Sequence, residues 1–224
     1  MNFSHRALGA ITLALSLAGT AAHAQIAITE VAPWSSGNSP VAADWFEITN
    51  FGSTAVNLSG WKIDDNSNSF VSSVALVGIT SIAAGESVVF IEGAAANANF
   101  VTTWFGGQVP AGLQIGRYSG AGIGLGAGGD ALNVYTAAGT LVTRVDFGAS
   151  PSSAPYASFD NAAGASGITL TALSVVGVNG AFVAAAGGEI GSPGRVGVVP
   201  EPGTWALMLA GMAAVGGIAR RRAA

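Results

Sequence analysis

Carboxylates are the only side chains in the middle of this chain that could carry acid–base chemistry. Histidine occurs only at His5 and His23, and cysteine is absent. A chain that loses its first 24 residues therefore has no Ser-His-Asp triad, no histidine-bound zinc and no thiol nucleophile.

Glu30 and Glu47 are the most suggestive carboxylate pair, because each lies among apolar residues of a predicted strand. Two carboxylates about 5 Å or roughly 6.5–9.5 Å apart across a cleft can hydrolyse a glycosidic bond. In the alternative interpretation, both side chains point outward or accept backbone hydrogen bonds at strand ends. We predict no catalytic residue. A carboxylate-based hydrolase would require a hydrogen-bonded cleft that contains both glutamates.

Asp64, Asn66 and Asn68 are the best candidates for an ion site, because they place oxygen ligands at alternating positions as calcium loops do. The EF-hand pattern fails, since Ser69 stands where its glycine belongs and Ala75 where its bidentate glutamate belongs. A polar turn built from Asx-turns is the alternative. We predict no metal and no cofactor.

Aromatic residues in or beside predicted loops could stack on sugars: Trp34, Trp104 and Tyr118. Alternatively, Trp104 packs a short helix onto the domain and Trp34 covers a sheet edge. Together with the Asp64 segment, these rings support a second functional hypothesis, which is a carbohydrate- or calcium-dependent adhesion domain.

The composition indicates a folded domain with few charges. Only 9% of the 224 residues are charged, against a usual share of about 25%, while 50% are hydrophobic and 33 are glycine. Residues 25–199 hold four basic and eleven acidic residues. Because phosphate neutralisation needs a basic stripe, nucleic-acid binding is not expected.

Residues 1–24 have the pattern of a secretory signal peptide. His5 and Arg6 precede an apolar run over residues 7–18. Ala22 and Ala24 then supply the small residues that a signal peptidase accepts, which predicts cleavage after Ala24. We expect a signal helix here and export of the rest of the chain through the inner membrane.

The last residues, 198–224, form a three-part tail. Residues 204–219 are uncharged, and at 1.5 Å per residue they would span about 24 Å, less than a hydrocarbon layer of roughly 30 Å. This predicts a short transmembrane helix that suits a temporary anchor, with its arginines on the cytoplasmic side. The residues assigned to sorting and processing are Pro200, Glu201, Pro202, Arg220, Arg221 and Arg222.

This tail resembles the PEP-CTERM sorting signal of Gram-negative bacteria. The resemblance implies that an exosortase cuts near Pro200-Glu201-Pro202 and releases or transfers the protein to the cell surface. It also implies a host that makes exopolysaccharide. A lasting single-span tail anchor is the alternative.

The middle of the chain is predicted to be one β-rich domain with antiparallel strands. Asn179-Gly180 is typical of a two-residue hairpin turn, and residues 94–105 are predicted to form the one helix, ended by Gly106-Gly107. Apolar runs between turn residues predict strands at 26–31, 44–50, 60–63, 87–92, 131–136, 141–147, 168–176 and 181–185.

Short motifs in this domain resemble the lamin-tail domain: Ile28-Thr29-Glu30-Val31, Asp44 to Asn50, Leu58-Ser59-Gly60-Trp61, Ala84-Gly85-Glu86, Gly139 to Gly148 and Ser192-Pro193-Gly194. The resemblance covers residues 26 to about 195 and implies an immunoglobulin-like β-sandwich. The glycine-rich run 120–129, the region around Phe159 and the stretch 168–186 depart from the pattern, which leaves the last strands open.

These observations divide the chain into a signal peptide (1–24), a lamin-tail-like domain (25–197) and a sorting signal (198–224). We expect an exported, non-enzymatic cell-surface or extracellular-matrix module. Its expected partners are an exosortase-type enzyme, transiently the inner membrane, and either exopolysaccharide or surface proteins.

Overall fold

The computed structural model describes residues 26–34, 39–93, 96–161 and 168–195. The predicted signal helix and the predicted tail helix lie outside these residues. Within them, none of the helical structure is long and apolar enough to cross a bilayer.

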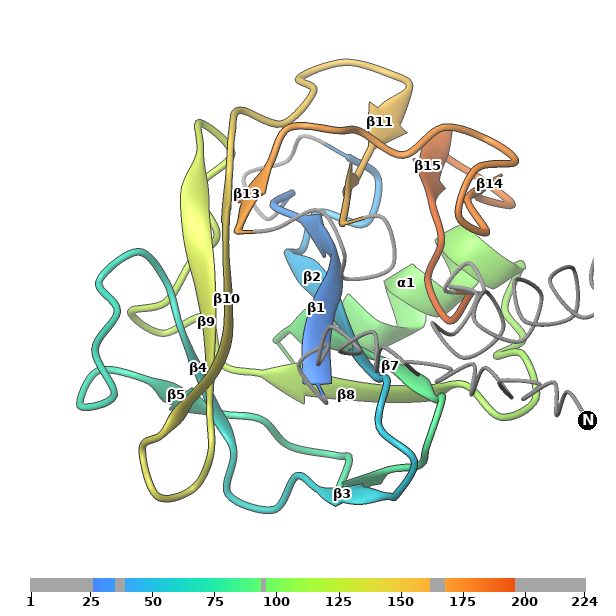
Figure 1. Ribbon diagram of the computed structural model, residues 1–224. Coiled ribbons are helices and arrows are strands. Elements are labelled where there is room, and N and C mark those ends of the chain that lie inside the picture. Colours follow the sequence, from blue (N-terminus) through green and yellow to red (C-terminus); the bar gives the residue numbers. More distant parts are fainter. Residues whose placement is uncertain (1–25, 35–38, 94–95, 162–167, 196–224) are drawn as a thin grey trace, which may run out of the picture. The chain divides into compact units, whose positions relative to one another are not determined.

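Five strands form the sheet that carries both candidate glutamates (Figure 1). In spatial order they are β12 (Phe159–Asp160), β1 (Ile26–Ala32), β2 (Trp45–Asn50), β7 (Ser87–Glu92) and β8 (Gln114–Tyr118). Neighbours run antiparallel except β7 and β8, which are parallel. Every residue of β1 and β2 is buried, so this sheet is covered on both faces.

A second five-stranded sheet packs against the first and completes the predicted β-sandwich. Its order is β13 (Thr169–Leu170), β10 (Leu141–Phe147), β9 (Asp130–Tyr135), β4 (Lys62–Asp64) and β5 (Val74–Ala75). Two smaller sheets consist of β11 (Tyr156–Ala157), β15 (Glu189–Gly191) and β14 (Phe182–Val183), and of β3 (Val56–Asn57) and β6 (Ser81–Ile82). Most strand pairs are antiparallel, although β10–β13 and β11–β15 are also parallel.

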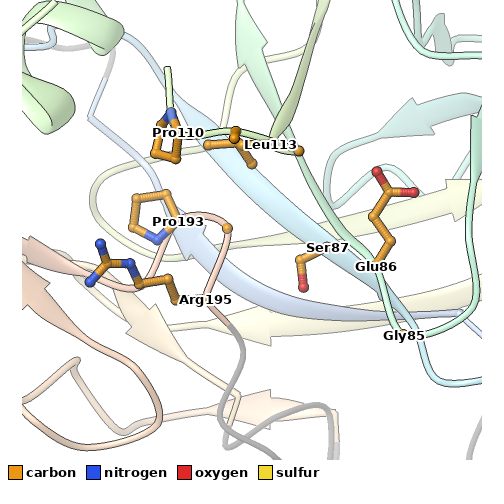
Figure 2. A pocket seen from close by; sticks show the side chains of 10 residues that line it. Gly85, Glu86, Ser87, Pro110, Leu113, Pro193 and Arg195 are labelled. Atoms are coloured by element: carbon orange, nitrogen blue, oxygen red, sulfur yellow. The ribbon is translucent and has the colours of Figure 1, made fainter. Parts of the chain in front are cut away.

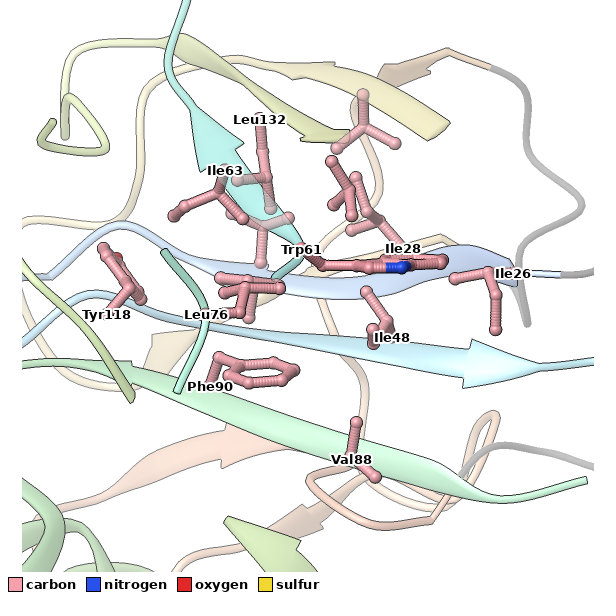
Figure 3. Close-up of a cluster of buried hydrophobic side chains, with 14 of the residues drawn as sticks. Ile26, Ile28, Ile48, Trp61, Ile63, Leu76, Val88, Phe90, Tyr118 and Leu132 are labelled. Atoms are coloured by element: carbon pink, nitrogen blue, oxygen red, sulfur yellow. The ribbon is translucent and has the colours of Figure 1, made fainter. Parts of the chain in front are cut away.

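The main hydrophobic core lies between the two large sheets. Ile28, Ile48 and Phe90 of the first sheet meet Ile63 and Leu132 of the second, and all five are fully buried (Figure 3). Residues two positions apart on one strand, such as Val88 and Phe90 on β7, both belong to this core, as the period of two in a β-strand requires. Burial of this apolar surface is the main force that holds the sheets together.

Trp61 enters this core from a tight turn. Gly60 adopts a φ of 76°, which residues with a β-carbon rarely adopt. The Trp61 amide donates to the carbonyl of Leu58 over 3.0 Å, which closes the turn. The indole is left only 7% exposed.

The outer face of the first sheet is covered by α1 (Ala96–Phe105) and by the sheet of β11, β15 and β14 (Figure 1). Trp45 on β2 makes edge-to-face contacts with Phe100 and Trp104 of the helix at ring distances of 5.5 Å. As predicted, α1 ends at Gly106 and Gly107, which have positive φ angles. The helix therefore caps an aromatic cluster rather than lying free on the surface.

The hypothesis that aromatic rings are exposed for sugar stacking is wrong for Trp34, Trp104 and Tyr118, whereas the alternative, in which Trp104 packs the helix onto the domain, is confirmed. Trp34, Trp104 and Tyr118 are at most 1% exposed. Trp34 packs edge-on against Trp45, and Tyr118 packs against Phe46 in the main core. These rings pack against other buried side chains, so a carbohydrate cannot stack on them.

The last predicted strands are mostly turns and extended loops. Within residues 168–185, only Thr169–Leu170 and Phe182–Val183 pair as strands. The Asn179-Gly180 turn is present, with φ angles of 47° and 84°. However, residues 175–178 form a second turn instead of the first arm of a hairpin, because the Val178 amide donates to the Val175 carbonyl over 2.9 Å.

Candidate functional site

A β-bulge in β1 brings Glu30 next to Glu47. Ile28 lies opposite Ile48, but the next paired residue is Glu30 opposite Glu47, so Thr29 is the extra residue. Without the bulge, strand alternation would turn Glu30 toward the main core beside Ile28. The bulge instead places both glutamates on the outer face of the sheet, on neighbouring strands.

Glu30 is fully buried beneath the segment that follows β15. Its carboxyl oxygens accept hydrogen bonds from the Ser192 amide at 2.9 and 3.1 Å and from the Ser192 hydroxyl at 3.0 Å. The Ser158 hydroxyl also donates to Glu30 Oε1. The carboxyl group therefore joins strand β1 to two segments more than 120 residues away in sequence.

Glu47 is fully buried as well, and it holds the next turn of the same segment. Its Oε2 accepts from the Gly194 amide over 2.6 Å, and its Oε1 accepts from the Thr29 hydroxyl over 2.7 Å. Hydroxyl contacts continue from Thr29 to Thr49 at 3.1 Å and from Thr49 to Ser87 at 2.7 Å. The bulge residue Thr29 is thus part of the network that satisfies Glu47.

Burial raises the pKa of both carboxyl groups above their usual value near 4.5. The pKa of Glu30 rises to about 7, against the opposing effect of the hydrogen bonds from Ser158 and Ser192. The pKa of Glu47 rises to about 8, first through burial and then through repulsion by Glu30. The salt bridge found in the described part of the chain joins two other residues, Arg144 and Asp146. At neutral pH, Glu47 is consequently mostly protonated and Glu30 is protonated in about half of the molecules.

The segment over the glutamates lies so close that β15 needs a glycine. A β-carbon at Gly191 would clash with Glu30 Oε1 and lie 2.9 Å from Trp104 Cη2 and 3.0 Å from Ser158 Oγ. Gly191 therefore allows residues 192–194, which we call the carboxyl cover, to approach both acids.

A shallow cavity of about 270 Å³ lies on the outer side of the carboxyl cover (Figure 2). It is lined by Gly85, Glu86, Ser87, Pro110, Ala111, Gly112, Leu113, Pro193, Gly194 and Arg195. Glu86 accepts hydrogen bonds from the Ala83 amide and the Gln114 side chain, while the Arg195 guanidinium stacks on Phe182 at 4.4 Å. Neither Glu30 nor Glu47 lines this cavity, so it gives no route to the carboxyl pair.

The structure brings the predicted carboxylate pair together but encloses it. Both side chains lie on the outer face of the sheet but are covered rather than exposed, and the alternative interpretation, in which they accept backbone hydrogen bonds, is confirmed by the Ser192 and Gly194 amides. Glycoside hydrolysis needs a substrate and a water molecule at the carboxyl groups. Both glutamates are 0% exposed, so the hydrogen-bonded cleft that this hypothesis requires does not form around them.

The predicted ion-binding residues Asp64, Asn66 and Asn68 lie in a polar turn after β4. Asp64 is fully buried and accepts from the Ser67 hydroxyl at 2.7 Å and the Ser69 amide at 2.6 Å.

The other two residues of this turn also take part in hydrogen bonds within the protein. The Asn66 amide donates to Asp130, and Asn68 Oδ1 accepts from the Tyr135 hydroxyl over 2.6 Å. An Asx-turn at Asp65, closed by the Ser67 amide at 2.9 Å, fits the alternative interpretation. Among the described residues, no group of three or more acidic or histidine side chains is placed to hold a metal ion.

Sequence reasoning did not identify the donors that complete the buried site. Ser158 and Thr29 do not stand out from other polar residues in the sequence. A sequence pattern also does not show which backbone amides will bind a buried side chain, as those of Ser192 and Gly194 do. Glu189 was also missed: it is fully buried, its Oε1 accepts from the Val41 amide over 3.2 Å, and burial raises its pKa. Ser192-Pro193-Gly194 was the one available signal, as a motif near the end of the domain.

A family model for the Lamin Tail Domain matches residues 19–149, more than half of the chain. The chain belongs to this family. The match includes β1, β2 and the bulge, but it ends before β11, β15 and the carboxyl cover. In this lamin tail domain, the glutamates thus lie within the family region, while their cover comes from residues beyond it. No curated protein matches the chain.

The PEP-CTERM protein-sorting motif matches residues 198–223. This match confirms the resemblance seen in the tail. It marks the chain as an exported protein of a Gram-negative bacterium, sorted to the cell surface by an exosortase-type enzyme.

We expect the stability of the protein to fall as the pH rises through the titration of the carboxyl pair. The folded state binds more protons than the unfolded chain between about pH 4.5 and 8, because folding raises both pKa values. The stabilisation is fully present below pH 4.5 and is lost as the pH passes about 7 to 8. The slope is about 1.4 kcal/mol per pH unit for each group that takes up a proton.

Urea unfolding of Glu47→Gln at about pH 5 and pH 8 checks this assignment. The amide cannot ionise, yet it can accept from the Gly194 amide and donate to the Thr29 hydroxyl, so the variant should lose much of the pH dependence. Glu86→Gln is the control, because its carboxylate is hydrogen-bonded outside the buried pair. An unchanged slope in Glu47→Gln would contradict the assignment.

Calcium should leave the melting temperature of the purified protein unchanged, because Asp64 and Asn68 already accept hydrogen bonds within the protein. Differential scanning calorimetry with EDTA and with millimolar calcium provides the comparison, and magnesium serves as the control cation. A large rise specific to calcium would show that the Asp64 turn is an ion site.

Proposed function

We propose that this protein is a non-enzymatic surface module that acts by binding or structural association with exopolysaccharide or surface proteins. The observation that carries the proposal is the combination of a lamin tail domain with a PEP-CTERM sorting tail in one chain. The first is a structural module and the second a sorting signal. The protein is therefore delivered to the place where such partners are found.

Two features support a role without catalysis. The most suggestive acidic pair, Glu30 and Glu47, is enclosed and hydrogen-bonded to the protein itself. The histidines lie only at His5 and His23, within the segment that we expect to be removed on export, and the chain has no cysteine. The remaining chemistry suits packing and recognition better than bond cleavage.

We infer three functional parts along the chain. Residues 1–24 act as a signal peptide that is cleaved after Ala24, and residues 25–197 form the exported domain. Residues 198–224 anchor the protein transiently in the inner membrane until an exosortase-type enzyme cuts near Pro200-Glu201-Pro202. The low charge of the domain suits association with uncharged polymer or protein surfaces.

Intact-mass measurement and terminal sequencing of the protein from its own host test this proposal. Protein from the extracellular fraction should begin at Gln25 and end near Pro200, since both ends are removed on the way to the surface. Replacing Pro200, Glu201 and Pro202 by alanine should leave the uncut chain in the membrane fraction. Pro110→Ala, at an exposed proline outside the tail, is the matched control.

Recovery of chains that still contain Arg222 from every fraction, with retention in the inner membrane, would contradict the proposal. The tail would then be a lasting anchor. A binding assay of the processed protein on surface polysaccharide of the host, compared with its surface proteins, identifies the class of partner.

A further inference from the structure

Three valines gather in one exposed turn between β13 and β14, within the orange connection of Figure 1. Val175, Val176 and Val178, which we call the valine turn, are 59%, 51% and 48% exposed. The turn has a defined backbone, because the Val178 amide donates to Val175 and the Ala181 amide donates to Val178, at 2.9 and 2.8 Å. A run of exposed β-branched residues on a fixed turn is a common sign of an interaction surface.

The exposed surroundings of the valine turn carry little charge, although the buried carboxylate of Asp160 accepts a hydrogen bond from Asn179 Nδ2 beside the turn over 2.7 Å. Residues 168–195 contain two ionisable side chains, Glu189 and Arg195. Glu189 is fully buried, so Arg195 is the exposed charge of this stretch. An apolar turn with a neighbouring cation matches the boundary between acyl chains and anionic headgroups.

The chain leaves the described domain beside the same turn. The carbonyl oxygen of Arg195 lies against Gly180, where a β-carbon would clash with it. The Arg195 side chain stacks on Phe182. Its amide donates to the Ser192 carbonyl over 2.7 Å, and the Ser192 amide is in turn bound by Glu30. Arg195, the last described residue before the tail, is thus fixed next to the valine turn.

The length of the connecting segment keeps this surface near a membrane that holds the tail. Eight residues, 196–203, separate Arg195 from the uncharged run at 204–219. A chain of this length reaches at most roughly 30 Å. Tethering at such a distance gives a millimolar effective concentration, at which a weak apolar contact is populated.

We propose that the valine turn docks on the lipid surface of the inner membrane while the tail is anchored there. This inference rests on the transient anchor of the proposed function. Docking holds Pro200-Glu201-Pro202 close to the membrane plane, where the processing enzyme meets it. Three valines are too small an anchor to remain bound alone, so cleavage of the tail also releases the docked surface.

Site-specific fluorescence tests the docking, and the absence of natural cysteine makes single labelling sites available. The full chain with Val176→Cys carries an environment-sensitive nitrobenzoxadiazole label in vesicles of phosphatidylethanolamine and phosphatidylglycerol. We expect a blue-shifted emission and quenching by doxyl-labelled lipid that is several times stronger than for the control. The control is Val71→Cys, an equally apolar site that is 94% exposed on the β4–β5 connection.

A second variant shows whether the valines themselves are responsible. With the label at Val178→Cys, the added substitutions Val175→Ser and Val176→Ser should reduce lipid quenching severalfold. Because both side chains are exposed, the fold is expected to tolerate serine.

Flotation of the same vesicles distinguishes failure of the membrane anchor from failure of the docking. A chain that does not float lacks the membrane anchor, which would overturn the proposed function. A chain that floats but shows equal, weak quenching at residues 176 and 71 would overturn only the docking. A blue shift that grows with protein density, without lipid quenching, would identify a second copy as the occupant and would also overturn it.

Discussion

Two carboxyl groups buried side by side impose the central constraint on this domain. Glu30 and Glu47 are fully buried on neighbouring strands, and the described part of the chain brings no salt-bridge partner to them. Such a pair is tolerated only if it keeps protons and if its oxygens find hydrogen-bond donors. The donors come from Ser158, Ser192 and Gly194, so the end of the domain must close over the first sheet.

Through this constraint, the buried glutamates also fix the C-terminal end of the described domain. The carboxyl cover fixes the backbone up to Arg195, after which the sorting tail begins within a few residues. The family region supplies the acids and the bulge that aligns them, while a later segment supplies the cover. The two glutamates therefore connect the region that the family model matches, residues 19–149, to the carboxyl cover, which lies outside that match. This arrangement explains why buried carboxylates occur in a domain whose proposed work is structural.

The strands of the main sandwich could be predicted because their side chains alternate or because both faces are apolar. Residues 87–92 and 141–147 are paired over their predicted ranges. β8 was missed, since Gln114–Tyr118 contains a glycine and an arginine. Residues 175 and 176 were wrongly predicted to belong to a strand over 168–176, because β-branched composition does not distinguish an exposed turn from a paired strand.

The candidate site was predictable in its residue types but not in its geometry. The two glutamates stood out among apolar neighbours. Their proximity depends on a one-residue bulge at Thr29, which no sequence motif predicts. Their burial depends on backbone amides almost 150 residues or more away. Register and long-range closure are set by tertiary packing, and a local pattern does not contain them.

The most direct test of this account is a carbon-13 NMR titration of the glutamate side-chain carboxyl signals in the purified protein. Glu47→Gln and Glu30→Gln assign the two buried resonances. The account predicts that both titrate above pH 6, far from the solvent-exposed glutamates, with the midpoint of each shifted when the other is replaced. Titration of both groups near pH 4.5, independently of each other, would show that the carboxyl pair is solvated and would contradict the central claim.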